Sequence, residues 1–286
     1  MIIDIHTHVF PDAIAARAVD KLKHNSHTQP FLDGTAASLS ASSAAAGVDL
    51  SVIQPVATSP AQVREINNGA IEMNRHSDVT RLMSFGCMHP GFERPEEECA
   101  WLAEEGVKGI KLHAVYQRTD MDDPSYVRVM KAAADAGLIV LVHAGIDVGF
   151  LELRHCDPDK IARAIDQAPD GRYILAHMGG WRQWDEAQAL FAGQENVWLD
   201  TSFSLGDMVP LDDGFYDTHS AARLSEERFL DMADAFGADR LLFGTDSPWE
   251  DQAAEIARIR ALPLTEEEKC AILGGNAARL LGLDQR

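Results

Sequence analysis

The first hydrophobic segment of the chain, MIIDIHTHVF, carries two histidines separated by a single threonine. In an extended strand, side chains at positions i and i+2 point to the same face. His6 and His8 would therefore share a face with Asp4. Ile3 and Ile5 would face the opposite way, toward the surrounding helices. Two imidazoles on one face of a strand can bind a single ion, so this segment predicts half of a metal site.

Further chemistry-bearing residues follow other apolar runs, at the points where strands would end. They are Lys111 and His113 in KLH, His143 in LVHAG, His177 in LAHMGG and Asp246 in FGTDSPW. A single histidine at a strand end is more often structural than functional, but burying several imidazoles and a carboxylate together without a metal is costly. Three neutral nitrogens and one carboxylate, a set suited to Zn²⁺, are offered by His6, His8, His143 and Asp246.

Zn²⁺ bound by this set would lower the pKa of water to about 7, which makes hydroxide available at neutral pH. Asp246 could take the proton of that water as the reaction proceeds. His177 could orient the water or stabilise charge that develops on the substrate. The pattern therefore predicts metal-assisted attack on a small molecule, with His177 and Asp246 as catalytic residues.

Strands that end on one side of the molecule must position these residues, and the chain offers eight short apolar runs separated by amphipathic stretches. The runs are Ile2–Ile5, Leu50–Ile53, Arg81–Phe85, Gly109–Leu112, Ile139–Val142, Tyr173–Ala176, Val197–Asp200 and Leu241–Gly244. Helix starts are predicted at Ser59-Pro60, Asp123-Pro124 and Asp157-Pro158, with a capping box at Thr265 to Glu268.

Eight strands joined by helices favour an α/β fold, a slightly distorted (β/α)₈ TIM barrel, in which the chemistry lies at the carboxyl ends of the strands. An open doubly wound sheet is disfavoured, because the sequence has no Gly-rich phosphate loop. We expect a single domain over residues 1–286, with loop insertions near 24–35 and 202–222. The second insertion is long enough for an active-site lid or specificity loop.

The composition is that of an ordinary globular protein, with 46% hydrophobic and 24% charged residues. The formal net charge of −20 argues against nucleic acid or an anionic membrane surface as a partner, since both need a basic surface. No apolar run reaches the roughly 20 residues of a membrane helix. The four cysteines have no C-x-x-C spacing and no secretory signal is recognisable, so we expect reduced thiols and a cytoplasmic location.

Five segments together resemble the amidohydrolase superfamily over residues 2 to about 283: DIHTH, the two strand ends with His143 and His177, LFGTDSPW, and ILGGNAARLLGL. The most similar branch contains the amidohydrolase-related proteins that include aminocarboxymuconate semialdehyde decarboxylase. The resemblance implies a distorted barrel that holds a metal through His6, His8, His143 and Asp246. In the mononuclear members, the histidine that matches His177 is not a ligand and activates the water or substrate.

Binuclear members of the superfamily instead use a carboxylated lysine as a bridge between two metals. Lys111 and His113 lie on the same expected strand and face, so a second metal stays open. The GIKLH segment resembles the mononuclear branch, which favours one metal. For Lys111 we expect a salt bridge or a solvated side chain near the barrel rim.

The resemblance leaves the reaction open, because members of the branch hydrolyse, hydrate or decarboxylate their substrates. We expect a metal-dependent hydrolase of a small, carboxylate-bearing organic molecule with one divalent ion, Zn²⁺ ahead of Mn²⁺ or Fe²⁺. The first alternative is a non-oxidative decarboxylase of a small aromatic or unsaturated carboxylic acid, a carbon-carbon lyase. The second is a catalytically silent metal-binding barrel. A homodimer is the expected assembly.

The candidates for contact with the substrate follow the strand ends. They are Phe10, His113, Tyr116, Gln117, Arg118, Trp181, Arg182 and Trp249. Arg118 or Arg182 could pair with a substrate carboxylate, although acidic proteins also carry such arginines on their surface. The role of Asp4 stays open.

Overall fold

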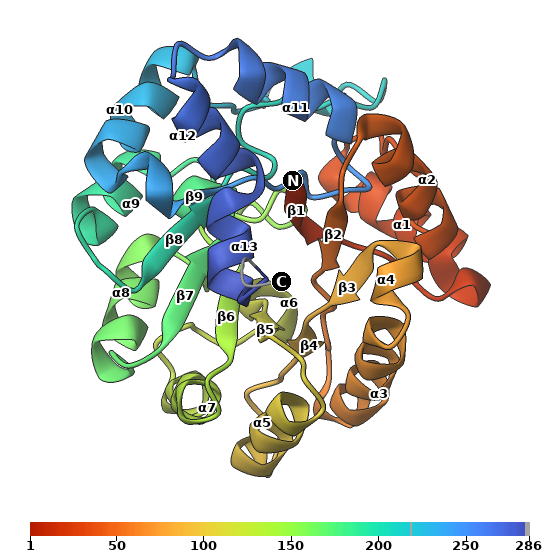
Figure 1. Cartoon of the computed structure of the whole chain (residues 1–286), viewed down its shortest axis with the longest axis vertical. Helices are drawn as coiled ribbons and strands as arrows, with labels where there is room; N and C mark the ends of the chain where they lie inside the picture. Colours follow the sequence, from red (N-terminus) through yellow and green to blue (C-terminus); the bar gives the residue numbers. More distant parts are fainter. Residues whose placement is uncertain (218, 284–286) are drawn as a thin grey trace.

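The computed structural model describes residues 1–217 and 219–283. Residue 218, inside the expected insertion at 202–222, and residues 284–286, at the end of the expected domain, lie outside the described residues. Short parallel strands form the centre of the molecule and helices surround them (Figure 1). None of the helices in the described part of the chain has the length and apolar character of a membrane span.

The described residues form nine short strands, one more than expected. They are β1 (Ile3–Thr7), β2 (Leu50–Ile53), β3 (Leu82–Ser84), β4 (Gly86–Cys87), β5 (Gly109–Leu112), β6 (Ile139–Val142), β7 (Arg172–Leu175), β8 (Val197–Asp200) and β9 (Leu241–Leu242). The expected run 81–85 contains only β3, and the additional strand β4 lies just beyond it, after Phe85. Strand β3 is paired to β2, and β4 is paired to β5. Two parallel sheets result, ordered β1-β2-β3 and β4-β5-β6-β7-β8-β9.

Main-chain contacts join these sheets into a ring at both junctions. Ile5 N donates to Phe243 O at 2.9 Å, next to a parallel bridge between Thr7 and Ser247. At the other junction, Phe85 N donates to Ile53 O at 2.9 Å. The fold is the expected (β/α)₈ TIM barrel, distorted where β3 meets β4. Segments that follow the strands therefore gather at one end of the barrel.

Helices and single helical turns cover the outside of the barrel (Figure 1). The longer helices are α1 (Asp12–Ser26), α2 (Ala36–Ala46), α3 (Val63–Asn74), α5 (Pro95–Glu104), α7 (Pro124–Asp135), α8 (Pro158–Gln167), α9 (Trp184–Phe191), α10 (Glu226–Phe236) and α11 (Gln252–Ala261). The shorter elements are η1 (Pro60–Gln62), α4 (Ser77–Thr80), α6 (Ala114–Gln117), η2 (His177–Gly179), η3 (Phe215–Asp217), η4 (Ala238–Arg240), α12 (Glu266–Cys270), η5 (Ala271–Gly275) and α13 (Asn276–Leu281).

The expected helix starts are found, with capping side chains at three of the four. At Ser59, before η1, the backbone N–H donates to Gln62 Oε1 at 3.1 Å in a capping box. Asp123 accepts from Ser125 N at 2.8 Å at the start of α7. Thr265 and Glu268 exchange the two bonds of a capping box at α12, at 2.8 and 3.2 Å. Asp157 precedes α8 without a side-chain cap bond.

Strand β1 departs from strict alternation, which corrects the expected distribution of its side chains. Its pairing with β2 is irregular between Asp4 and Thr7. Ile3 and Ile5 do not face the surrounding helices; they join the strand residues of an inner cluster, which α13 completes. His6 also turns inward, whereas the Asp4 carboxylate accepts from Gln252 of α11 at 2.8 Å. Asp4 and His6 therefore do not share a face.

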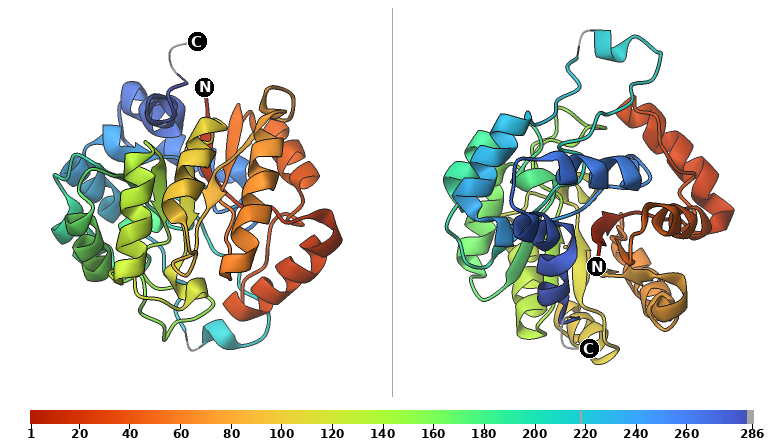
Figure 2. Two further views of the ribbon diagram at one scale, coloured as in Figure 1. Left: turned by 90° about the horizontal axis from the view of Figure 1, so that it is seen from below. Right: turned by 45° about the horizontal axis from the view of Figure 1, so that its top comes forward.

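The two expected insertions contact each other. Residues 24–26 continue α1, so the first insertion begins only at His27. Thr28 and Pro210 form an antiparallel bridge, flanked by bonds from Gln29 N to Val209 O (2.7 Å) and from Leu211 N to His27 O (2.8 Å). Figure 2 shows the second insertion reaching across to α1. The first insertion also contacts the segment that follows β9, because Phe31 N donates to Pro248 O. The two insertions therefore lie together beside that segment.

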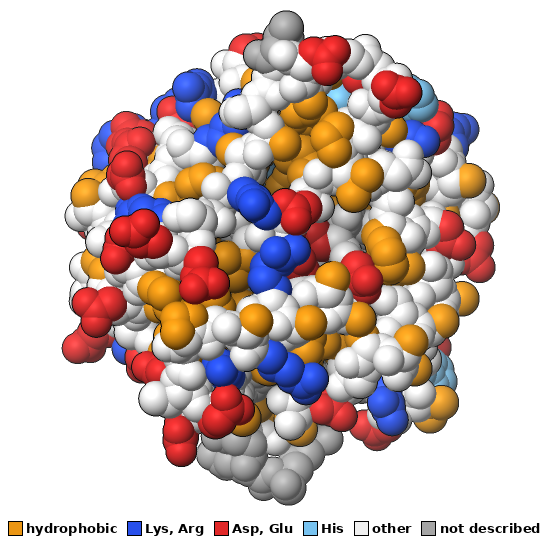
Figure 3. Space-filling model, turned by 90° about the horizontal axis from the view of Figure 1, so that it is seen from above, with side chains coloured by type: hydrophobic (Ala, Val, Ile, Leu, Met, Phe, Trp, Pro, Cys, Tyr) orange, Lys and Arg blue, Asp and Glu red, His pale blue; other side chains and the backbone are white. Residues whose placement is uncertain are grey.

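The surface in Figure 3 carries acidic and basic side chains next to one another, without a continuous basic area. The chain as a whole has 45 acidic and 25 basic residues. This face therefore lacks the basic footprint of nucleic-acid binding.

Candidate metal centre and active site

Three of the four expected metal ligands lie together, at the end of β1 and shortly after β9. His6 Nε2 lies 3.1 Å from His8 Nε2 and 3.4 Å from Asp246 Oδ1, and His8 Nε2 lies 3.0 Å from the same oxygen. Ligand atoms on one tetrahedral ion with bonds of about 2.0–2.1 Å are about 3.3 Å apart. The three atoms therefore fit a single divalent ion, and their types suit Zn²⁺, Mn²⁺ or Fe²⁺.

Asp246 is fixed by its backbone as well as by its histidine contacts. Its φ of 52° is left-handed, and its N–H donates to His6 O at 2.8 Å. Burial opposes ionisation of the carboxyl, but the hydrogen bond from His8 and the electrostatic interactions with the imidazoles of His6 and His8 hold its pKa at about 2. The side chain is therefore an ionised carboxylate, the form in which it can bind a cation.

Asp200, the last residue of β8, was missed by the sequence reasoning although it also ends an apolar run. Its Oδ2 accepts from His6 Nδ1 at 2.9 Å, and its Oδ1 accepts from the backbone N–H of His177 at 3.0 Å. Ser202 donates to Oδ1 through both its backbone N–H and its hydroxyl. With Nδ1–H donated to Asp200, the neutral His6 ring presents the lone pair of Nε2 to His8 and Asp246.

His177 lies in η2, directly after β7, and is 4% exposed. Its Nδ1 is 3.1 Å from the carbonyl oxygen of Ser202, which only accepts, so Nδ1 carries the proton. The lone pair of the neutral ring is then on Nε2, 3.1 Å from His143 Nδ1. Burial lowers the pKa of His177, which keeps the ring neutral and able to accept a proton.

His143, the fourth expected ligand, is not part of the compact group formed by His6, His8 and Asp246. It lies after β6 and groups instead with His113 and Asp147. The sequence reasoning named His113 as a candidate for substrate contact but did not include Asp147. The His113 and His143 rings are stacked at 4.2 Å, and their Nε2 atoms lie 3.6 and 3.7 Å from Asp147 Oδ2. These distances exceed a hydrogen bond, and His143 Nε2 has no hydrogen-bond partner among the described residues.

Tyr116 extends the stack of His113 and His143 away from the candidate ligands His6, His8 and Asp246. Its ring stacks on the ring of His113 with centroids 3.9 Å apart, and it meets Phe150 edge-on. On the other side, the ring of His143 contacts the ring of His177 edge to face, with centroids 4.9 Å apart. Aromatic and imidazole rings therefore form a continuous wall from Tyr116 to His177, next to the candidate metal ligands.

Lys111 contradicts the expectation of a salt bridge or a solvated side chain at the rim. It is 1% exposed, and its Nζ lies 3.2 Å from His6 Nε2. Burial lowers its pKa to about 8, although the charges of Asp200 and Asp246 act in the opposite direction. Lys111 is therefore an interior residue of the candidate site.

Asp4 is not one of the candidate metal ligands, but it holds the segments that carry them. Its carboxylate accepts from Thr245 N (3.1 Å), Thr245 Oγ (2.6 Å) and Gln252 Nε2 (2.8 Å). These bonds join β1 to the segment that carries Asp246. The role left open by the sequence is thus a positional one.

The aromatic candidates for substrate contact lie close to His177 or at the edge of the site. Trp181 is buried in an apolar cluster with Phe203, whose ring centroid lies 6.3 Å from that of His177. Trp249 is half-buried against the same cluster. Phe10 is also half-buried, and its N–H donates to Gly34 O at 2.8 Å.

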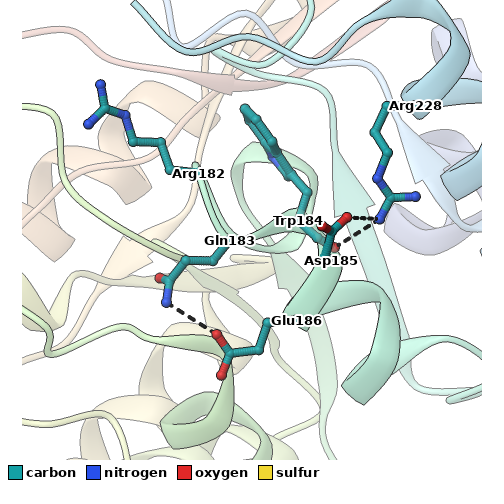
Figure 4. Close-up of a pocket in the computed structure, with 6 residues that line it drawn as sticks. All are labelled: Arg182, Gln183, Trp184, Asp185, Glu186 and Arg228. Carbon is teal, nitrogen blue, oxygen red and sulfur yellow. Dashed lines mark hydrogen bonds and ion pairs between the residues drawn. The ribbon is translucent and has the colours of Figure 1, made fainter. Parts of the chain in front are cut away.

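Neither expected arginine contacts an imidazole of the site. Arg118 is exposed and ends α6 in a left-handed conformation, with a φ of 53°. Arg182 donates to the carbonyl of Ser220, and its guanidinium lies over the ring of Trp181 at 4.6 Å. It points away from the other side chains labelled in Figure 4. Gln117 is structural, since its amide donates to two main-chain carbonyls at 2.7 Å.

A hollow of about 450 Å³ opens on the outer surface at the start of α9 (Figure 4). Its polar side chains are paired with each other, Arg228 with Asp185 at 2.7 Å and Gln183 with Glu186 at 3.3 Å. No histidine lines it. The hollow therefore offers none of the chemistry found at the barrel end.

Two buried carboxyl groups hold the second insertion against the barrel. Glu250 accepts from Phe203 N at 2.7 Å, and a methyl group at Gly206 would lie 2.3 and 2.4 Å from the Oε1 atoms of Glu250 and Glu255. Burial raises the pKa of both groups, and the charge of Glu255 raises that of Glu250 further. Each of the two carboxyl groups therefore binds a proton more readily than an exposed glutamic acid does.

Comparison with known proteins relates the whole chain to one family. The family model described as Amidohydrolase matches residues 3–283. No curated protein matches the sequence. Among solved structures, an uncharacterised TIM-barrel protein from Bordetella bronchiseptica is 18% identical, with a TM-score of 0.74 and coverage of 100% of this chain and 99% of that one.

Two further structures carry names that state an activity. The 2,6-dihydroxybenzoate decarboxylase from Rhizobium is 17% identical, with a TM-score of 0.68 and 99% of each chain covered. A probable 2-pyrone-4,6-dicarboxylic acid hydrolase from Acinetobacter baumannii is 16% identical, with a TM-score of 0.65 and coverage of 98% of this chain and 99% of that one. At these identities the likeness concerns the fold alone.

Proposed function

This chain belongs to the amidohydrolase family, and we propose that it is a hydrolase of a small, carboxylate-bearing organic molecule that works with one bound divalent ion. Zn²⁺ is the ion we favour. The observation that supports the proposal is the spacing of His6 Nε2, His8 Nε2 and Asp246 Oδ1, which lie 3.0 to 3.4 Å apart. Three such atoms fit three of the four positions around Zn²⁺.

When bound, Zn²⁺ would polarise a substrate oxygen and acidify water. His6 and His8 would hold the ion through Nε2, and Asp246 through its ionised carboxylate. His143 is the fourth ligand we propose, after a shift toward this group. His6 is suited to bind the ion through Nε2, because Asp200 holds the proton of the ring on Nδ1.

His177 is the residue we propose as proton acceptor. Its Nδ1–H is engaged by the Ser202 carbonyl, so Nε2 can take a proton from water and later return it to the leaving group. Asp246, beside the proposed metal position, could also take a proton from that water. Trp181 and Phe203 exclude bulk water from the side of His177.

A decarboxylase of a small aromatic or unsaturated acid is the second candidate. It is favoured by the stacked wall of Tyr116, His113 and His143, since planar substrates stack well on aromatic rings. A structure of similar fold is a dihydroxybenzoate decarboxylase. Hydrolysis consumes water and releases an acid or amine, whereas decarboxylation releases carbon dioxide, so the products separate the two.

The experiment uses Zn²⁺-loaded protein with two substrate panels: esters, lactones and amides that carry a carboxylate, and aromatic or unsaturated acids. Acid release and carbon dioxide release are followed in parallel. His177→Asn should keep the metal and lose about 10²–10⁴-fold in turnover, the usual contribution of general acid–base catalysis. His76→Asn, an exposed histidine paired with Glu72, is the control. Turnover that persists in His177→Asn, or a folded protein that takes up no metal, would contradict the proposal.

A further inference from the structure

Lys111 is the one buried amine at the end of the barrel whose role the proposed function leaves open. On β5 it pairs with Cys87 of β4 and Leu141 of β6, in the middle of the sheet. Its neighbours Ile110 and Leu112 belong to the outer core, so Lys111 points inward. It is among the largest fully buried side chains of the described chain.

The ammonium of Lys111 lacks partners for its charge. It has three N–H donors, yet its one hydrogen-bond contact among the described residues is His6 Nε2, at 3.2 Å. No carboxylate of the described chain forms an ion pair with it. The nearby Asp200 is used by His6, His177 and Ser202, and a buried, unpaired ammonium is costly.

The two arginines expected to contact the substrate do not reach the imidazoles of the site. Arg118 is exposed at the end of α6, and Arg182 is bonded to Ser220. Within the described residues, Lys111 is thus the only lysine or arginine in hydrogen-bond contact with the imidazoles of the site.

We propose that Lys111 Nζ binds a carboxylate of the substrate, beside the cluster of His6, His8 and Asp246. This assignment rests on the proposed function, and it moves the role expected for Arg118 or Arg182 to Lys111. A substrate carboxylate at this position satisfies the free donors of the ammonium. It also fixes the substrate next to His6, so the site selects anionic molecules over neutral ones of the same shape.

The test titrates Zn²⁺-loaded protein with benzoate and with its neutral analogue benzamide, by calorimetry. The wild type should bind benzoate more tightly. Lys111→Met should lose at least about tenfold in affinity for benzoate, which corresponds to the free energy of one charge-assisted hydrogen bond. Its affinity for benzamide should not change. Lys108→Met, an exposed lysine three residues earlier, should behave as the wild type. Lys111→Gln is the second variant, used if Lys111→Met does not fold.

Three results would overturn the assignment. The first is a wild type that does not prefer benzoate, or a Lys111→Met that retains the preference. The second is loss of Zn²⁺ rather than of benzoate affinity, which would make Lys111 a support of the metal. The third is a carbamate on Nζ, seen by ¹³C NMR with labelled bicarbonate and absent in Lys111→Met. Metal content measured in the same samples separates these results from failure of the proposed function, which predicts metal uptake.

Discussion

Asp200→Asn should weaken metal binding although Asp200 would not touch the metal. The asparagine side chain can keep Oδ1 as the acceptor for the backbone N–H groups of His177 and Ser202, which lie 3.0 and 3.1 Å away. Its amide nitrogen then takes the place of Oδ2 and faces His6 Nδ1, 2.9 Å away. Because an amide nitrogen donates, His6 must accept at Nδ1 and move its proton to Nε2. The lone pair that would bind the ion is thereby lost.

The magnitude follows from the effect of such supporting partners, whose removal costs about 10- to 100-fold in metal affinity. This corresponds to about 1.4–2.8 kcal/mol. The assay is competition for Zn²⁺ between metal-free protein and a chromogenic chelator, with thermal unfolding of the metal-free proteins as the check on folding.

Ser202→Ala is the matched control for Asp200→Asn. It removes the hydroxyl that donates to Asp200 but keeps both the carboxylate and the Ser202 carbonyl. It should therefore change Zn²⁺ affinity much less. A folded Asp200→Asn with unchanged affinity would refute the tautomer argument, and an equal loss in Ser202→Ala would show that local packing, not the proton on His6, sets the affinity.

Three further outcomes test other parts of the structure. Zn²⁺ at 100 times its Kd should raise the free energy of unfolding by about 2.7 kcal/mol; His8→Ala should lose this gain in denaturant titrations and His76→Ala should keep it. Gly145→Ala should lower the free energy of unfolding by about 2–4 kcal/mol, because φ is +83° and the new Cβ would lie 2.3 Å from Trp181 N. Gly106→Ala, with φ +84° but open space, isolates the conformational part, and an equal loss there would contradict the clash. Since the folded-state pKa of Glu250 and Glu255 is raised, the native protein holds the extra proton, and wild-type stability should fall as pH rises above the ordinary glutamic acid range. Glu255→Gln should flatten this dependence in urea titrations across pH, and parallel profiles would contradict the raised pKa of Glu255.

The barrel and much of the site could be predicted because they depend on the order of apolar runs along the chain and on the residues that follow each run. Apolar runs separated by amphipathic stretches predicted every strand except β4, which follows the expected run 81–85. The resemblance over the whole chain is confirmed by the family match. His6, His8 and Asp246 come together because the carboxyl ends of barrel strands meet. The ligand role of these residues, and of His143, stays a prediction.

What the sequence could not supply is local geometry. Strict alternation placed Asp4 and His6 on one face, but the irregular pairing of β1 turns only His6 inward. The break at Phe85 was not predicted, because the run LMSF reads as one strand although Ser84 and Gly86 flank Phe85. Lys111 was placed on the correct face, yet a long charged side chain gives no sign in the sequence that it will be buried rather than solvated.

The end of β8 contacts both a proposed metal ligand, His6, and the proposed proton acceptor, His177. Asp200 fixes the proton on His6 Nδ1, and two residues later the Ser202 carbonyl fixes the proton on His177 Nδ1. The Ser202 hydroxyl lies between the two rings, 3.0 Å from one Nδ1 and 3.1 Å from the other. Both imidazoles therefore present Nε2 because of one short turn. A displacement of that turn would change the ligand and the proton acceptor together, so substitutions of Asp200 should alter the pH dependence of turnover as well as the affinity for the ion.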